Sequence, residues 1–233
     1  MAKIKYSALV SDMRNKLNGS VLSKNRYGSY IRNKVTPVNP QTSYQQNARQ
    51  QLGVLSSQWN GLTDAQRSGW RALASQIPST DIFGDQKFLS GQVLYVKLNA
   101  NLDKIGETTV SPAPAPVSIP AGALSSLVAE ETAGAMVSLD LTFNITSLPA
   151  GFKMAIYATP GVRPGRSFVK NQFRYIGSAD TITTSEFDAL ALWNARFGTV
   201  NPGDRIFVRT ALVSTGSGQQ GTPSEAVGTI ATV

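Results

Sequence analysis

The residues that most often carry enzymatic chemistry are missing from this sequence. It contains no histidine and no cysteine. Histidine is the commonest general base and the commonest metal ligand, and a cysteine thiolate serves as a nucleophile or a soft metal ligand. Catalytic triads built on histidine, thiol nucleophiles, disulfides and thiolate metal centres are therefore excluded.

The carboxylates that remain are scattered along the chain. None follows the spacing of a calcium-binding loop, and a carboxylate without a partner to shift its pKa carries little catalytic weight. The doublet Glu130–Glu131 is interpreted as a solvated strand end. Gly161–Arg166 resembles a phosphate-binding loop, but its internal proline and the lack of a following helix pattern predict a hairpin turn. We therefore expect no catalytic, cofactor or metal site, and predict that the protein is not an enzyme.

Positive charge is concentrated near the N-terminus. Residues 1–36 hold eight basic side chains and one acidic side chain, Asp12, so this segment contributes +7 of the formal net charge of +8. Such asymmetry is typical of an interaction arm that meets an acidic protein face or nucleic acid.

Two kinds of partner fit this basic segment. Cations that alternate with tyrosines can pair with and stack on single-stranded nucleic acid. A basic, tyrosine-bearing arm can equally lie across a neighbouring protein subunit and become ordered there. We favour a protein partner, because the rest of the sequence lacks the basic pattern of a nucleic-acid-binding domain. The predicted interaction residues are Lys3, Lys5, Arg14, Lys16, Lys24, Arg26, Tyr27, Tyr30, Arg32 and Lys34.

The elements that position these residues begin with a basic arm over residues 1–40. Two short β-prone runs, residues 19–23 and 29–32, flank a loop at residues 24–28 and predict a hairpin. Pro37 and Pro40 then favour an extended, stiff strap, because each disfavours helix in the residue before it.

Three helices are expected between residues 41 and 105. Thr42 or Ser43 can cap the first helix, and Thr63 with Gln66 forms a capping box for the second. The first helix should end at Asn60–Gly61, which predicts an antiparallel helical hairpin. Apolar residues at spacings of three and four predict three buried faces that close one small core. These residues are Ala48, Leu52, Leu55 and Trp59; Trp70, Leu73 and Ile77; and Phe88, Gly91, Tyr95, Leu98 and Leu102.

In the third part of the chain, the spacing of apolar residues changes from the helical period of 3.6 to the strand period of 2. Residues 106–120 include Ser111–Pro116, a proline–alanine run that predicts a linker. Beyond it, apolar and polar residues alternate over residues 137–143 and 206–211, and further strands are expected near residues 152–158, 173–176 and 227–233. One helix is expected over residues 185–197. The predicted fold class is α+β: a basic N-terminal arm, a three-helix domain and an antiparallel β-sandwich over residues 121–233.

Composition is that of an ordinary folded protein. Hydrophobic residues make up 41% of the 233 residues, and the mean hydropathy is -0.11. No apolar stretch approaches the roughly 18 residues needed to span a membrane, and no apolar core of a signal peptide follows the basic N-terminus. We expect neither membrane association nor Sec-dependent export.

One recurrent pattern covers residues 1 to about 102. It consists of Arg32–Thr42, followed by Gln45, Gln46, Arg49, Trp59, Leu62, Thr63, Gln66, Arg67 and Trp70, and later by Ile82–Gly84 and Gly91–Leu98. This pattern resembles structural proteins of tailed phages and prophages of Bacteroidota-type hosts, crAss-like phages among them. The C-terminal part loosely resembles the Ig-like or fibronectin type III modules that phages append to virion proteins.

The resemblance implies a non-enzymatic, multi-copy subunit of the capsid or of a head–tail or tail ring, assembled into the virion in the host cytoplasm. Its expected partners are portal, capsid or tail subunits and copies of itself, with no cofactor. The alternative is a DNA-binding protein whose basic arm contacts packaged nucleic acid.

Overall fold

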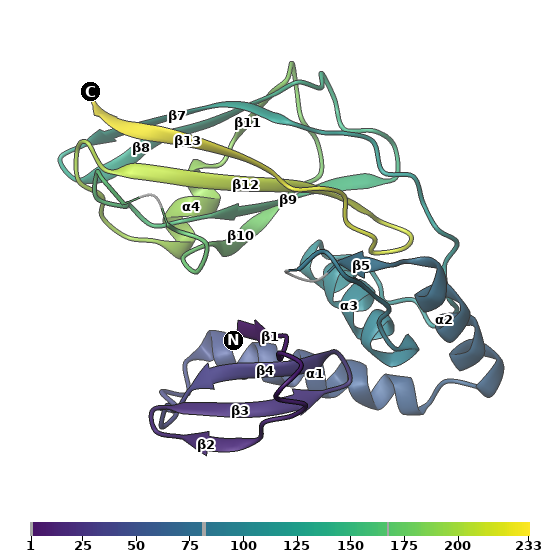
Figure 1. Cartoon of the computed structure of the whole chain (residues 1–233). Helices are drawn as coiled ribbons and strands as arrows, with labels where there is room; N and C mark the ends of the chain where they lie inside the picture. Colours follow the sequence, from purple (N-terminus) through teal and green to yellow (C-terminus); the bar gives the residue numbers. More distant parts are fainter. Residues whose placement is uncertain (1, 81–82, 167) are drawn as a thin grey trace.

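A computed structural model describes residues 2–80, 83–166 and 168–233 and arranges them in three parts (Figure 1). A small N-terminal sheet lies at the lower left of this view. Three helices lie at the right, and a larger curled sheet with one helix lies above them. The chain thus combines helices with mostly antiparallel sheets, as the predicted α+β class requires.

The N-terminal segment forms a four-stranded antiparallel sheet in the order β1-β4-β3-β2. Its strands are β1 (Ala2–Ile4), β2 (Asn15–Leu17), β3 (Ser20–Asn25) and β4 (Gly28–Asn33). The predicted hairpin corresponds to β3 and β4, but its turn is shorter than expected, because Asn25 pairs with Gly28. Strands β1 and β2 were not predicted, since three residues are too few to show an alternating pattern.

Three helices follow an irregular strap at residues 34–42. They are α1 (Ser43–Asn60), α2 (Asp64–Gln76) and α3 (Gly91–Lys104). Thr42 caps α1 by accepting a hydrogen bond from the backbone N–H of Gln45 at 3.3 Å, as the sequence predicted. A two-stranded ladder of β5 (Ser79–Thr80) and β6 (Gln86–Lys87) joins α2 to α3.

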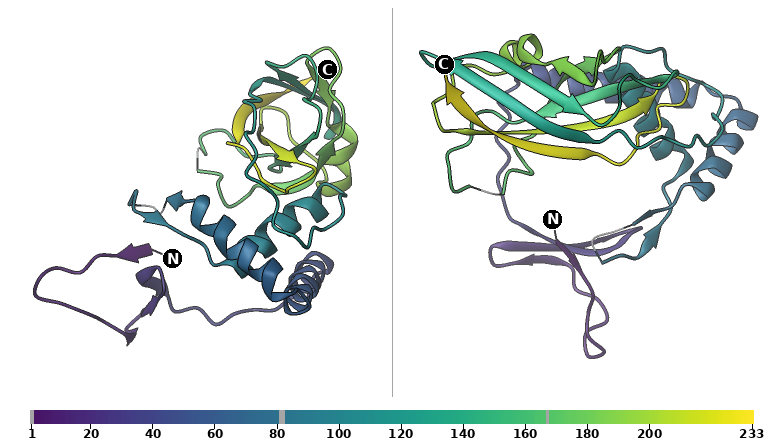
Figure 2. Two further views of the ribbon diagram at one scale, coloured as in Figure 1. Left: turned by 90° about the vertical axis from the view of Figure 1, so that its right-hand side faces the viewer. Right: turned by 90° about the horizontal axis from the view of Figure 1, so that it is seen from above.

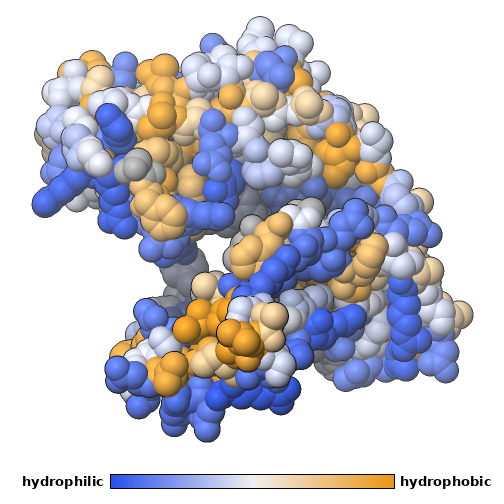
Figure 3. Space-filling model, in the orientation of Figure 1, coloured by the Kyte–Doolittle hydropathy of each residue, from blue (hydrophilic) through white to orange (hydrophobic). Residues whose placement is uncertain are grey.

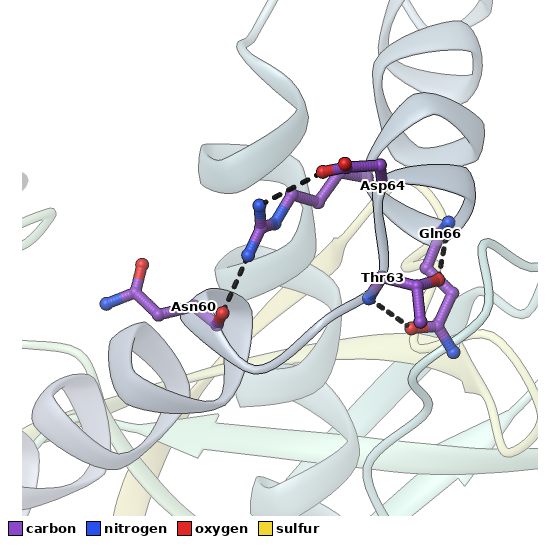
Figure 4. Close-up of polar contacts among 5 residues, drawn as sticks. Asn60, Thr63, Asp64 and Gln66 are labelled. Carbon is purple, nitrogen blue, oxygen red and sulfur yellow. Dashed lines mark hydrogen bonds and ion pairs between the residues drawn. The ribbon is translucent and has the colours of Figure 1, made fainter.

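The turn between α1 and α2 is fixed by local side-chain contacts (Figure 4). Thr63 and Gln66 form the predicted capping box, each side chain accepting from the other residue's backbone N–H. Arg67 lies 3.3 Å from the Asp64 carboxylate and donates to the Asn60 carbonyl at 2.6 Å. These contacts join the end of one helix to the start of the next.

Three aromatic side chains dominate the helical core. Trp70 is fully buried, and the Tyr95 ring lies edge-on to it with centroids 5.2 Å apart. Trp59 lies 5.5 Å from Tyr95. Helix α3 packs against both α1 and α2. The predicted antiparallel α1–α2 hairpin is therefore replaced by an arrangement in which α3 holds the other two helices.

Two of the predicted apolar faces are only partly correct. Leu55 and Trp59 of α1 are buried, but Ala48 is exposed and Leu52 is 55% exposed, because the core covers only the C-terminal turns of α1. Phe88 lies before α3 rather than in it, and its side chain is also exposed.

The C-terminal part is one seven-stranded sheet in the order β10-β9-β12-β13-β7-β8-β11. Every neighbouring pair is antiparallel except β13 with β7, which is parallel. The sheet curls until its two halves face each other across a core, so the predicted sandwich is present as two halves of one sheet (Figure 2). The strands are β7 (Leu124–Thr132), β8 (Ala135–Phe143), β9 (Phe152–Ala158), β10 (Arg174–Ala179), β11 (Glu186–Asp188), β12 (Arg205–Ser214) and β13 (Ser224–Thr232).

Helix α4 (Leu190–Arg196) is shorter than the helix predicted over residues 185–197. Thr184 and Ser185 take positive φ values, and the chain then adds β11 to the edge beside β8 before α4 begins. Trp193 of α4 is fully buried in the core, and Phe187 of β11 packs against the same core. The apolar residues therefore share a side of the fold without sharing one helix.

The interpretation of Glu130–Glu131 as a solvated doublet is wrong for the second residue. Glu131 is 2% exposed. Its carboxylate accepts from the backbone N–H of Gly134 at 2.7 Å and from the Thr232 hydroxyl at 2.9 Å. Strand alternation points Glu131 inward, and these two donors satisfy it there.

Residues 106–120 are extended, as their prolines predict, and they are hydrogen-bonded to both neighbouring parts. The Asn99 side chain bonds the backbone N–H and carbonyl of Val110, and the Trp70 indole donates to the Ser111 carbonyl at 2.8 Å. On the other side, the Gln219 amide donates to the Ala115 carbonyl at 3.1 Å.

The end of α3 also packs directly on the curled sheet, along a contact we call the seam. Leu102 and Ile105 form a small core with Ala155 and Val213. The Tyr175 hydroxyl donates to the Lys104 carbonyl. This second core explains why β12 is buried on both faces from Thr210 to Ser214, so that the alternation predicted for residues 206–211 ends at Thr210.

Candidate interaction surface

Cross-strand pairing decides which predicted interaction residues share a face of the N-terminal sheet. Residues directly opposite in a β-ladder point to the same side. Arg32 lies opposite Val21, which lies opposite Lys16. Lys3 lies opposite Tyr30, two residues from Arg32 on β4. Lys3, Lys16, Val21, Tyr30 and Arg32 therefore share one side, which we call the basic face.

The other side of this sheet is more apolar. Ile31 lies opposite Ala2 and Leu22, and Lys24 lies opposite Ser29. Leu22, at 6% exposure, is the one side chain of these four strands that is buried, judged over the described residues. A sheet that buries so little apolar surface has little packing free energy of its own to offset the entropy of ordering.

Four of the predicted residues, Lys3, Lys5, Arg26 and Tyr27, lie at a junction with the helical part. Lys5 forms an ion pair with Asp85 at 2.9 Å, and Lys87 lies 5.9 Å from the centroid of the Tyr27 ring. Arg26 lies over the same ring at 5.3 Å. These residues line a cavity of about 510 Å³ between the β3–β4 turn and residues 83–88. The structure thus uses Lys5, Arg26 and Tyr27 in contacts within the chain.

The remaining basic residues differ in how their charge is neutralised. Arg14 pairs with Asp12 at 2.9 Å just before β2. Lys34 follows β4, where its backbone N–H donates to the Gly19 carbonyl. Within the described residues, Lys16, Arg32 and Lys34 form no ion pair, and all three are exposed. On the basic face, Lys16 and Arg32 therefore present charge that forms no ion pair within the described part of the chain.

The N-terminal sheet stands apart from the curled sheet. The space-filling view shows an open gap between them (Figure 3). The contacts of the small sheet with the rest of the chain include the Lys5–Asp85 pair, and the strap at residues 34–42 leads from it to α1. The structure therefore keeps this sheet at the periphery.

Sequence reasoning missed a second basic segment in the long loop between β9 and β10. Arg163, Arg166 and Lys170 occur there, Arg174 begins β10, and no acidic residue lies between Thr159 and Ala179. Phe168 in this loop is 70% exposed. The signal was present in the sequence, but counting charge over the whole C-terminal part cancelled these cations against distant acids.

Across residues 2–80, 83–166 and 168–233, no group of three or more acidic residues is arranged to hold a metal ion. In the same residues, no helix has the length and apolarity needed to cross a membrane. The Gly161–Arg166 segment is a loop with no helix after it, as expected for a turn.

Comparisons with known proteins assign no family. No protein-family model matches the chain, and no curated protein matches it. Among solved structures, catalytically inactive OgpA from Akkermansia muciniphila, in complex with an O-glycopeptide substrate, is 10% identical with a TM-score of 0.26. The match covers 63% of this chain and 38% of that chain. A TM-score of this size is too low to infer a shared fold or activity.

Proposed function

We propose that the protein is a non-enzymatic structural subunit of a tailed-phage particle, present in many copies in the capsid or in a head–tail or tail ring. In this proposal the basic face holds each copy to neighbouring portal, capsid or tail subunits or to other copies. The observation that carries the proposal is that face: Lys16 and Arg32 are exposed and form no ion pair in the described part of the chain, and the peripheral sheet that carries them has one buried side chain among its described residues. Such a sheet gains its missing packing and its counter-charges from a neighbour.

The positions of the phage-like sequence pattern support the same proposal. Arg32–Thr42 forms the end of β4 and the strap, and Thr63, Gln66 and Arg67 fix the α1–α2 turn. Trp70 lies at the centre of the helical core. The pattern therefore coincides with the parts that set the position of the N-terminal sheet, which is what a subunit with a fixed place in an assembly needs.

We also propose that the C-terminal part is an Ig-like or fibronectin type III-like module. Its strand order supports this. If β7, β8 and β11 are named A, B and E, and β9, β10, β12 and β13 are named C, C′, F and G, the two halves are A-B-E and C′-C-F-G. This is the grouping of strands in such modules, with Greek-key connections between the halves. Helix α4 is then an insertion between strands E and F.

Removal of the N-terminal sheet tests the virion proposal. Cells producing the particle should incorporate the full-length chain but not a chain lacking residues 1–36, because the deleted segment carries the basic face. The helical and C-terminal parts of the shortened chain should keep their circular dichroism spectrum. Trp70 and Trp193 lie in two separate hydrophobic cores, and neither core includes residues 2–36. Normal incorporation of the shortened chain, measured by mass spectrometry of purified particles, would contradict the proposal.

Binding to packaged DNA is a second candidate, favoured by the basic loop between β9 and β10. The three cations of this loop, Arg174 at the start of β10 and the exposed Phe168 are of the types that contact phosphates and stack on bases. Salt distinguishes the two functions, because each phosphate contact on duplex DNA adds about -0.9 to the slope of log affinity against log salt. Four to six such contacts give a slope of about -4 to -5 for a labelled duplex. If the labelled duplex shows no change in electrophoretic mobility with the protein at about 50 mM salt, DNA binding is ruled out as the function.

A further inference from the structure

The curled sheet carries a surface of opposite charge to the basic face. On the outer side of β7, β8 and β11, Asp140 lies opposite both Val128 and Asp188. In the next rows, Glu186 lies opposite Thr142, and Glu130 lies opposite Ser138. We call this surface, with carboxylates Glu130, Asp140, Glu186 and Asp188, the acidic face.

The acidic face has no cations of its own. The sequence contains no lysine or arginine between residues 105 and 152 or between residues 175 and 195, the stretches that contain these three strands. In the described part of the chain, none of the four carboxylates forms an ion pair. Asp140 and Asp188 are directly opposite across two strands, and like charges in that position destabilise a sheet. An external cation relieves this repulsion.

The two faces match in chemistry and in layout. Each consists of charged residues in cross-strand rows beside an apolar residue. In the basic face, Val21 lies between Arg32 and Lys16. In the acidic face, Val128, which is 48% exposed, lies beside Asp140 in the row that ends at Asp188. Opposite charges can therefore meet around an apolar centre, the arrangement found in specific protein interfaces.

The two faces cannot meet within one chain. Figure 1 places the N-terminal sheet at the bottom of the molecule and β7, β8 and β11 at the top, with β9 and β10 on the side of the curled sheet nearer to the N-terminal sheet. Contact between two different surfaces of identical subunits is heterologous, and it generates a ring when the rotation closes and a filament when it does not.

We propose that the basic face of one copy docks on the acidic face of a second copy, so that the subunits join head to tail. This inference rests on the proposed function, and it names the neighbour and the surface that the N-terminal sheet grips. The partner is a second copy of this chain. Another virion protein or nucleic acid on the basic face is an alternative outcome of the test.

Charge exchange between the faces tests the proposal. Variant N carries K16E and R32E on the basic face, and variant S carries D140K and D188K on the acidic face. We expect the wild-type chain to self-associate at about 50 mM salt in sedimentation velocity, and N and S each to associate at least tenfold more weakly. Association should return in a chain with all four substitutions and in an equimolar mixture of N and S, because both restore opposite charges.

A matched control and a covalent readout sharpen this test. K24E with K97E removes the same charge as variant N from exposed sites outside the basic face and should associate like wild type. Because the chain has no native cysteine, V21C with V128C should give a ladder of disulfide-linked multimers under mild oxidation. Either substitution alone should give dimers at most. V21C with V227C, a pair with an exposed valine on β13, should give no ladder.

Each remaining outcome has one meaning. A wild-type chain that stays monomeric at its highest soluble concentration, or failure of all four substitutions to restore association, overturns the head-to-tail contact. If variant N is then still missing from particles, the sheet grips a different protein and the proposed function stands. If variant N enters particles normally, both the head-to-tail contact and the proposed role of the basic face in assembly are wrong. Loss of binding to a labelled DNA strand in N but not in S would instead assign the basic face to nucleic acid.

Discussion

Trp70 connects three parts of the helical unit through one side chain. It is fully buried in α2, its ring meets Tyr95 of α3 edge-on, and its indole N–H donates to the carbonyl of Ser111 in the linker. The same residue therefore contributes apolar burial, an aromatic contact and the hydrogen bond that holds the linker against the helices.

Replacement of Trp70 by alanine should lower the free energy of unfolding by about 3–5 kcal/mol, the range for a large buried aromatic residue. Trp70→Phe keeps a ring but loses the bond to Ser111, so its cost should be smaller by about half. Urea unfolding followed by circular dichroism measures both. An unchanged midpoint for Trp70→Ala would show that this side chain is not in the core.

Side-chain contacts were predictable from the sequence where they are local. Thr63 and Gln66 are three residues apart, so their capping box follows from helix geometry alone. The ion pair of Lys5 with Asp85 joins residues about 80 positions apart, and neither residue has a sequence context that selects the other. The candidate surface was therefore predicted as a list of cations, but not as two faces and a junction.

At the scale of elements, α1 shows that the spacing of apolar residues predicts a helix but not how much of it is buried. Its apolar residues lie on one side of the helix, which predicted a buried face over its whole length. Burial requires a partner at each position, and the core reaches only Leu55 and Trp59. The helix was thus correctly predicted while the extent of its packing was not.

This difference gives a paired test on one helix. Leu55→Ala should cost about 2–5 kcal/mol of unfolding free energy, because Leu55 is 2% exposed. Leu52→Ala, one turn away and 55% exposed, should change it by no more than about 0.5 kcal/mol. Chemical denaturation of the isolated subunit compares them, and equal costs for the two leucines would contradict this packing of α1.

Among the strands, prediction succeeded for β9 but missed the nine-residue β7 (Leu124–Thr132) and the three-residue β11. β9 was predicted with its observed bounds, Phe152–Ala158. β11 has three residues, and its Phe187 falls at helical spacing from Leu190 and Trp193, so the sequence pattern favoured one long helix. Only pairing with β8, a long-range contact, makes these residues a strand.

At the scale of the whole molecule, Lys153 joins the linker to the curled sheet. Its ammonium group lies 2.9 Å from Glu107 and 3.2 Å from Asp180, and it donates to the Ile105 carbonyl at 3.3 Å. The hydrogen bond to Glu107, followed by the interactions with Asp180, raises the pKa of Lys153 despite an opposing effect of desolvation. Burial also raises the pKa of Tyr157 and of Tyr175 near the seam.

These shifts set the pH range in which the seam is stable. A lysine with a raised pKa in the folded state contributes its full stabilisation below the unfolded value, near 10.4, and loses it as pH rises through the folded value. The two tyrosines act in the same direction, because folding favours their neutral form. The free energy of unfolding should therefore be insensitive to these groups between pH 7 and 9 and fall above about pH 10.

Lys153→Met isolates the contribution of the ion pairs. The variant should lose roughly 1–2 kcal/mol at pH 8, since the two carboxylates it leaves are partly solvated. Its free energy of unfolding should also fall less steeply between pH 9 and 11. The loss of stability caused by ionisation of Tyr157 and Tyr175 should remain. Urea unfolding across this range tests the expectation, and a fall as steep as that of the wild-type chain would place the alkaline sensitivity elsewhere.

The parallel pairing of β7 with β13 has a mechanical consequence. Because the first and last strands of the module run in the same direction, the start of β7 and the end of β13 lie at opposite ends of the pair. Tension applied between residues 123 and 233 then slides these strands along each other, and the hydrogen bonds between them are strained together rather than opened one after another. A C-terminal part tethered in this way resists stretching more than one whose terminal strands peel apart.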